Sequence, residues 1–175
     1  MKINQLFVTS VLTASLAAAA NADAPAPGCY KPVRGFATSI CTDAVACSTQ
    51  SGIYRLVLRN DDAPWGERRL VVSGTFNGFL ENVDQETNVS TLRHVLMDAS
   101  AGGQIFTGPD IGIPVGGDGV ETIEVIETLT VNAGAGAYQG IVPGGTVTLE
   151  GQLGLQTGIN SFTVKRTAED VVCFE

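Results

Sequence analysis

Glu127 and His94 are the two residues whose types and positions suggest chemistry. Each occupies the apolar face of a segment that has the period-two alternation of a β-strand. The face of Glu127 otherwise carries Ile123, Val125, Leu129 and Val131, and the face of His94 carries Leu92 and Leu96. If both faces line one interior of low dielectric constant, burial raises the pKa of the Glu127 carboxyl group. The two side chains can then work as a general acid and a general base.

Each candidate residue also has an interpretation without chemistry. A β-bulge near Glu127 shifts the register and turns its side chain into solvent, and His94 is then a hydrogen-bonded wall residue. Tyr138 and Trp65 are candidate ligand contacts. Tyr138 is the large side chain of a glycine-rich corner, where packing as a plug is the alternative. Trp65 lies in a polar loop, where it forms either a rim contact or a lid.

The spacing of the glycine, cysteine and aspartate residues argues against nucleotide and metal sites. Gly134-x-Gly136 does not predict a nucleotide site, because a dinucleotide fingerprint opens a helix and the T-V-T-L-E-G run that follows is strand-like. We expect no cofactor and no metal site. The cysteines lack paired C-x-x-C spacing, and the single histidine is far from them in sequence. Asp61, Asp62 and Asp118 lack the ligand spacing of a calcium loop.

Four cysteines in an exported chain predict two disulfides, for which three pairings are possible. We favour Cys41–Cys47, which closes a small loop, and Cys29–Cys173, which ties the two ends of the chain together. In the chain-entropy treatment, the longer closure contributes about 4–5 kcal/mol to stability.

Residues 1–22 are predicted to be a signal peptide. Lys2 precedes an apolar run from Leu6 to Ala20, and small residues mark a cleavage site before residue 23. The run is too short for a membrane span, and no later segment approaches the required length. The net charge of −8, without a basic run, argues against nucleic acid and anionic membranes as partners. We therefore expect a secreted or periplasmic protein.

The remaining chain predicts an all-β fold. We divide it into an N-terminal disulfide-tied segment, residues 23–52, and a strand-rich domain, residues 53–175. Residues 35–50 are small and polar and are predicted to lie on the surface, and residues 111–115 are an edge strand or loop because Pro114 interrupts them. Strands are predicted at residues 53–58, 69–80, 89–98, 104–107, 123–131, 146–155, 161–165 and 171–174. Their number and spacing predict a single antiparallel β-barrel of about eight strands.

Four short segments resemble the allene oxide cyclase/dirigent-type β-barrel group, especially its small exported bacterial members. They are R-H-V-L at 93–96, G-Q-I-F-T at 103–107, E-T-L-T-V at 127–131 and G-A-G-A-Y-Q-G at 134–140. The resemblance implies a calycin-like antiparallel barrel with a central cavity. Members of the group are cyclases, stereochemical guides or proteins without known activity. The catalytic residues of the plant cyclase have no counterparts here, so the resemblance assigns none.

Three functions follow as hypotheses. The first and favoured one is an exported barrel that binds a small apolar ligand or has a structural role, without catalysis. The second is a cyclase or isomerase that shapes an apolar substrate, assisted by Glu127 and His94. The third is an extracellular interaction module that uses the loop around Trp65.

Overall fold

The computed structural model describes residues 24–43 and 47–175, and within these ranges every regular element is a strand. The signal peptide predicted for residues 1–22 lies outside the described residues. The eleven strands are β1 (Gly28–Cys41), β2 (Thr49–Arg59), β3 (Arg69–Val83), β4 (Ser90–Asp98), β5 (Gly103–Thr107), β6 (Asp110–Gly117), β7 (Thr122–Gly136), β8 (Ile141–Val142), β9 (Thr146–Gly154), β10 (Ile159–Val164) and β11 (Val172–Phe174). The predicted all-β class is confirmed.

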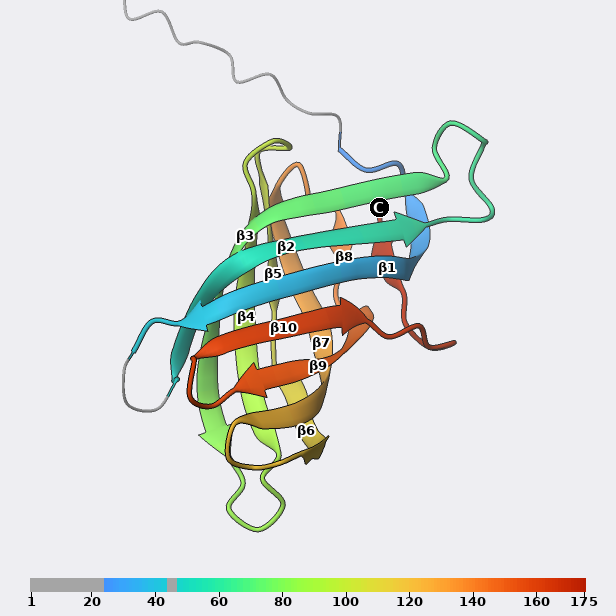
Figure 1. Cartoon of the computed structure of the whole chain (residues 1–175). Coiled ribbons are helices and arrows are strands. Elements are labelled where there is room, and N and C mark those ends of the chain that lie inside the picture. Colours follow the sequence, from blue (N-terminus) through green and yellow to red (C-terminus); the bar gives the residue numbers. More distant parts are fainter. Residues whose placement is uncertain (1–23, 44–46) are drawn as a thin grey trace, which may run out of the picture.

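Eight of the strands pair edge to edge in a closed ring. The order is β1, β2, β3, β4, β5, β7, β9 and β10, and β10 pairs again with β1. Every pairing is antiparallel. Figure 1 shows the long strands curving around a common interior. Because a closed ring leaves no free long edge, all eight strands have hydrogen-bonding neighbours on both sides.

Strands β5 and β6 share one lane of the ring. Both lie between β4 and β7, with β5 against one half of each neighbour and β6 against the other half. The lane is interrupted at Gly108 and Pro109, and Gly108 has a φ of 130°, a backbone conformation that favours glycine. As predicted for a proline-containing segment, Pro114 sits where β6 no longer pairs with β4.

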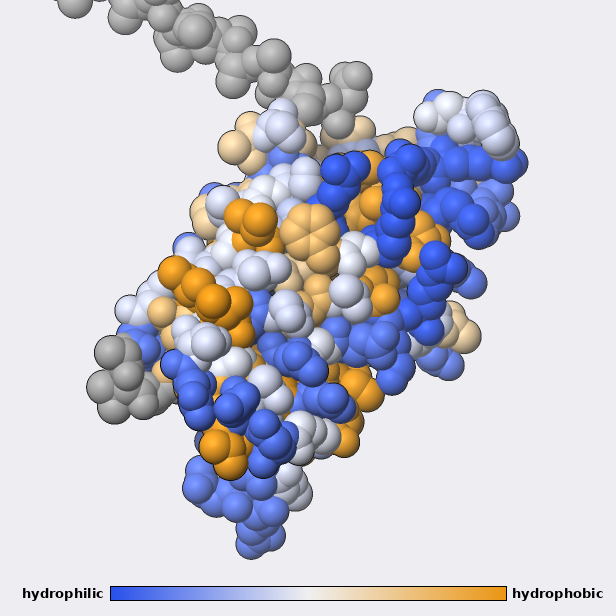
Figure 2. Space-filling view, viewed as in Figure 1, coloured by the Kyte–Doolittle hydropathy of each residue, from blue (hydrophilic) through white to orange (hydrophobic). Residues whose placement is uncertain are grey.

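The N-terminal region differs from the prediction. Residues 35–41, expected in a surface segment outside the strand-rich domain, belong to β1, which pairs with β2 and β10 across the whole segment. The predicted boundary at residue 53 falls inside β2. The interior side of β1 carries small residues, Ala37 and Ser39, so its apolar alternation is weak. Its exposed side carries Phe36 and Ile40, and apolar side chains stand between polar ones on this face in Figure 2.

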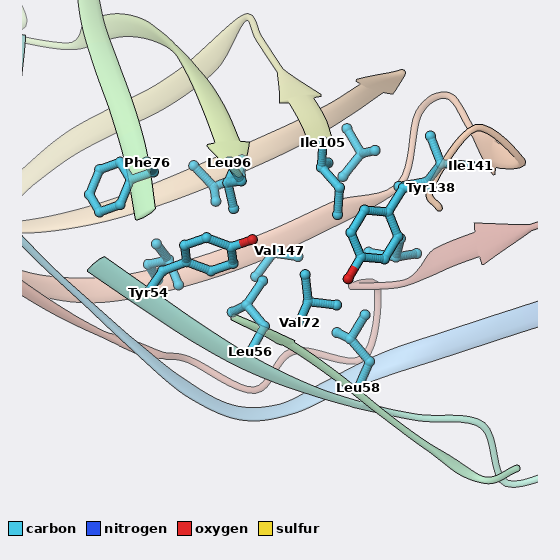
Figure 3. Close-up of a cluster of buried hydrophobic side chains, with 14 of the residues drawn as sticks. Tyr54, Leu56, Leu58, Val72, Phe76, Leu96, Ile105, Tyr138, Ile141 and Val147 are labelled. Atoms are coloured by element: carbon cyan, nitrogen blue, oxygen red, sulfur yellow. The ribbon is translucent and has the colours of Figure 1, made fainter. Parts of the chain in front are cut away.

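The core fills the ring from side to side. It contains buried aliphatic and aromatic residues from β2, β3, β4, β5, β7, β9 and β10. Figure 3 shows Tyr54 and Phe76 in one part of this cluster and Tyr138 and Ile141 in another. At the Tyr138 end, β8 and β11 extend the sheet beyond β1, and Tyr30 and Tyr138 pack against Phe174.

Both predicted disulfides are present. Cys29–Cys173 joins β1 to β11 with an S–S distance of 2.05 Å, and Cys41 pairs with Cys47. The first bridge fastens the two ends of the described chain at the Tyr138 end of the ring. The second closes the β1–β2 connection at the other end.

Candidate functional site

The ring places His94 and Glu127 side by side in its interior. His94 comes from β4 and Glu127 from β7, and their exposed fractions are 5% and 4%. Their closest atoms, Nε2 of His94 and Oε1 of Glu127, are 3.7 Å apart. The predicted alternation is correct for both strands, since Val125, Leu129 and Leu96 are also buried. No bulge turns Glu127 into solvent.

A second acidic residue, Asp110, contacts the other nitrogen of the imidazole. Its Oδ2 atom lies 2.8 Å from His94 Nδ1 and accepts a 2.5 Å hydrogen bond from the Thr107 hydroxyl. Its Oδ1 atom accepts a 2.7 Å bond from the Thr130 backbone N–H. Thr107 also accepts a bond from the backbone N–H of His94. These donors compensate the burial of a carboxylate that is 0% exposed.

The interruption of the shared lane explains why Asp110 points inward. In an unbroken strand, Thr107 and Asp110 would face opposite sides because they are three residues apart. Gly108 and Pro109 reset the alternation, and both side chains are buried. Sequence reasoning missed Asp110 for this reason. The available signal was the Gly-Pro pair directly before an acidic residue.

Gln50 completes the polar cluster and was also missed, because it lies in the stretch predicted to be surface. Its Oε1 atom accepts bonds from Ser39 Oγ at 2.7 Å and Asn160 Nδ2 at 3.0 Å. These bonds direct the amide nitrogen toward His94 Nε2, at 3.4 Å. Gly78 leaves space for this contact, because a Cβ atom there would lie 2.7 Å from the Gln50 amide and 2.8 Å from the His94 ring.

Burial governs the proton affinity of the pair. Desolvation raises the pKa of Glu127, the neighbouring Asp110 carboxylate raises it further, and His94 opposes both. Desolvation lowers the pKa of His94, but the hydrogen bond to Asp110 and the charges of Glu127 and Asp110 raise it to a net value above the ordinary one. The pair as a whole therefore retains a proton to higher pH than the separate groups would in solvent.

The pair faces a small cavity with mostly apolar walls. The cavity volume is about 30 Å³, and the walls include Tyr54, Phe76 and Phe162. Phe76 also packs against the imidazole, with 5.7 Å between ring centres. A single water needs roughly 10–15 Å³ by the same measure, so the cavity has room for about two. Glu127 Oε1 is buried and has no hydrogen-bond partner among the described residues.

His94, Asp110 and Glu127 form the group that comes closest to a metal site in the described part of the chain, with donor atoms within 4.8 Å of one another. The geometry does not suit an ion. Both Asp110 oxygens are engaged by protein donors, which leaves one imidazole nitrogen and one carboxylate. Protein zinc sites use three or four side-chain ligands, and the Gln50 N–H points at the remaining nitrogen.

The other two predicted contact residues lie elsewhere. Tyr138 is buried in the core, where its hydroxyl donates a 2.8 Å hydrogen bond to Asp98, and it does not line the cavity. Trp65 is 87% exposed in the loop between β2 and β3, with the Arg68 guanidinium 5.7 Å from the centre of its ring. The structure therefore brings Glu127 and His94 together and leaves Tyr138 and Trp65 outside the site.

Comparison with known proteins adds no relative: no family model, no curated protein and no solved structure matches the chain. Within the described residues, no helix has the length and apolar character needed to cross a membrane. The chemistry of the interior cluster is thus the principal basis for a functional assignment.

Proposed function

We propose that the protein is an isomerase or cyclase that transfers protons on a small, mainly apolar molecule held inside the ring. One observation carries the proposal: Nε2 of His94 and Oε1 of Glu127 are buried 3.7 Å apart, beside an apolar cavity. Two proton-carrying groups at this separation can serve neighbouring atoms of one bound molecule. The unpartnered Oε1 atom supports the proposal. A buried carboxyl oxygen without a hydrogen-bond partner costs stability, and a bound molecule would supply that partner.

The fold supports placing this activity in a barrel of the allene oxide cyclase/dirigent-like kind. The ring has the eight strands and antiparallel order of a small barrel, whose interior holds at most one small ligand. The motif segments 93–96 and 127–131 carry His94 and Glu127. The two disulfides agree with an oxidising location outside the cytosol, and we propose a secreted or periplasmic enzyme.

Deuterium transfer tests the activity even while the substrate is unidentified. The protein is incubated in D₂O with an apolar extract of its host, and deuterium uptake by small molecules is followed by mass spectrometry. We expect the wild type to label a small set of compounds and both Glu127→Gln and His94→Gln to label none. Glu124→Gln is the matched control, because Glu124 lies on the same strand but is exposed. Labelling by all four proteins, or by none, contradicts the proposal.

Binding without catalysis is the second candidate, and the apolar walls of the cavity favour it. It predicts that native mass spectrometry of protein purified from its host shows a bound small molecule. This molecule should be chemically unchanged when it is released from the protein. The cavity volume of about 30 Å³ restricts this candidate and the proton-transfer function alike to very small molecules.

A further inference from the structure

The hydrogen bonds around His94 determine which imidazole nitrogen carries the proton. Asp110 is acceptor-only as a carboxylate, so Nδ1 of His94 donates to it across 2.8 Å. Gln50 presents an N–H toward Nε2, because its oxygen is occupied by Ser39 and Asn160. A donor facing Nε2 requires a lone pair there. His94 and Glu127 share one proton, and the donor at Nε2 favours the arrangement in which this proton lies on Glu127, so His94 faces the cavity as a neutral base.

The same contacts place a proton on Glu127. Its carboxyl group is 4% exposed and has no cation beside it once His94 is neutral. Asp110 already contributes one buried negative charge close by, and a second would be strongly disfavoured. Glu127 thus faces the cavity as a carboxylic acid, next to the basic nitrogen of His94.

The walls restrict the molecule on which such a pair can act. Of the described residues that line the cavity, none is Lys or Arg, so nothing there compensates the charge of a carboxylate or phosphate. Apart from Gln50, His94 and Glu127, the lining consists of alanine, leucine and aromatic residues. A suitable substrate is uncharged, has an apolar body and carries one polar group that reaches the acid and the base.

We infer that the substrate is a small neutral carbonyl compound, with His94 Nε2 as the base, Glu127 as the acid, and Gln50 and Asp110 as positioning residues. This inference rests on the proposed function. A carbonyl group fits because its oxygen accepts from Glu127, while the adjacent C–H is acidic enough for an imidazole once that oxygen is protonated.

The reaction balances without any other reagent. His94 Nε2 takes a proton from the carbon next to the carbonyl group, and the C–H electron pair becomes a C=C bond. The C=O π pair moves to oxygen, which takes the proton of Glu127. The products are an enol, an imidazolium and a carboxylate. Return of the His94 proton to carbon, at the same or a conjugated position, and of the enol proton to Glu127 restores both residues.

The state of the imidazole is measured directly, because His94 is the single histidine of the chain. In untagged ¹⁵N-histidine protein at neutral pH, we expect NMR shifts of a protonated Nδ1 and an unprotonated Nε2. Gln50→Leu removes the donor and should shift the population toward the Nε2–H form. Gln104→Leu, an exposed glutamine on β5, should leave the spectrum unchanged. A wild-type histidine protonated at Nε2 overturns the assignment of roles.

Acetone is the probe for the substrate class, since it is small and neutral, and acetate is an anion with the same number of heavy atoms. We expect the protein to speed exchange of acetone protons for deuterium in D₂O, followed by proton NMR, and saturation transfer to acetone but not to acetate. Glu127→Gln should lower the exchange rate by about 10²–10⁴-fold, the usual contribution of one acid or base. His94→Gln should abolish the exchange, and Glu124→Gln should have no effect.

The outcomes separate this inference from the function on which it rests. Deuterium uptake from the host extract without acetone exchange overturns the carbonyl assignment and keeps the proton-transfer function. Saturation transfer to acetate overturns the restriction to neutral substrates. If neither the compounds of the host extract nor acetone take up deuterium, the proposed function itself is overturned.

Discussion

The interior of the ring contains two buried acidic clusters that differ in how their hydrogen bonds are completed. At one end, Asp98 accepts from the Tyr138 hydroxyl, the Ser100 hydroxyl and backbone, and the Ala101 and Ser73 backbone. At the other end, Glu127 Oε1 has no partner among the described residues. Asp98 is four positions after His94 on β4, so the clusters are roughly 13 Å apart along that strand.

The net pKa shifts of the two carboxyl groups are consequently opposite in direction. Desolvation raises the pKa of Asp98, but hydrogen bonds from Ser100, Tyr138, Ala101 and Ser73 outweigh it and the net pKa falls. Desolvation of Glu127 is opposed chiefly by an imidazole that is too far away for a strong hydrogen bond, and its net pKa rises. The Asp98 end is therefore built for stability. The Glu127 end keeps a group ready to exchange protons at a cost in stability.

Removing the disulfides, one at each end of the ring, should have the largest effect on the free energy of unfolding. Replacing Cys29 and Cys173 by alanine removes a link across 144 residues and should lower the free energy of unfolding by about 5 kcal/mol. Replacing Cys41 and Cys47 removes a link across 6 residues and should cost about 2 kcal/mol. Urea denaturation of both double variants measures the two losses. Equal losses would contradict the expected dependence on loop length.

Tyr138→Ala should also be strongly destabilising, by about 3–5 kcal/mol, because it removes a buried ring from the core. Tyr138→Phe keeps the ring and loses the hydrogen bond to Asp98, so we expect a cost of about 1–2 kcal/mol. The same denaturation experiment measures both. A loss below about 1 kcal/mol for the alanine variant would place Tyr138 outside the supporting core.

Glu127→Gln should change the pH dependence of stability rather than weaken the protein at all pH values. Folding raises the pKa of Glu127 above its ordinary value of 4.5. The Glu127 contribution to the free energy of unfolding is therefore fully present below pH 4.5 and is lost as the pH rises through the pKa of the folded state. The variant lacks this loss, so it should match or exceed the wild type in stability at about pH 8. Melting temperatures measured from acidic to mildly alkaline pH test this.

The exposed control Glu124→Gln should reproduce the wild-type pH profile. A Glu127→Gln profile parallel to the wild-type profile would mean that the carboxyl group is not held with a raised pKa.

The smallest effect is expected at Trp65. Its side chain is 87% exposed, so Trp65→Ala should change the free energy of unfolding by less than about 0.5 kcal/mol. If the loop is an interaction module, capture of host surface proteins by the immobilised protein should be lost in this variant. Unchanged capture would leave the interior as the sole candidate site among the described residues.

The alternation of apolar residues was sufficient to predict seven of the eight ring strands, all except β1, and the two central site residues. Glu127 and His94 stand in regular strands, where every second residue points inward. The cysteine count predicted two disulfides, and the pairing favoured among the three possible ones is the pairing present. Trp65 and Tyr138, chosen because each is a large residue in a loop or corner, have no part in the cavity.

The supporting residues of the site escaped prediction for physical reasons. Asp110 points inward because the backbone turns at Gly108, and an alternation rule does not anticipate such a reset. Gln50 lies in the part of β2 that pairs with the end of β1. The small inner residues of β1 hide the strand pattern of β1, so this pairing was not predicted. Long-range pairing, between Asn160 and Gln50 for example, is a property of the assembled ring.

Closure of the ring depends on a pairing between segments made at very different times. β1 is synthesised more than a hundred residues before its partner β10. Until residues 159–164 arrive, the outer edge of β1 has unpaired backbone groups, which invite contact with other chains. We therefore expect the ring to close only after β10 has been delivered, and folding to be slow because its decisive contacts are remote in sequence.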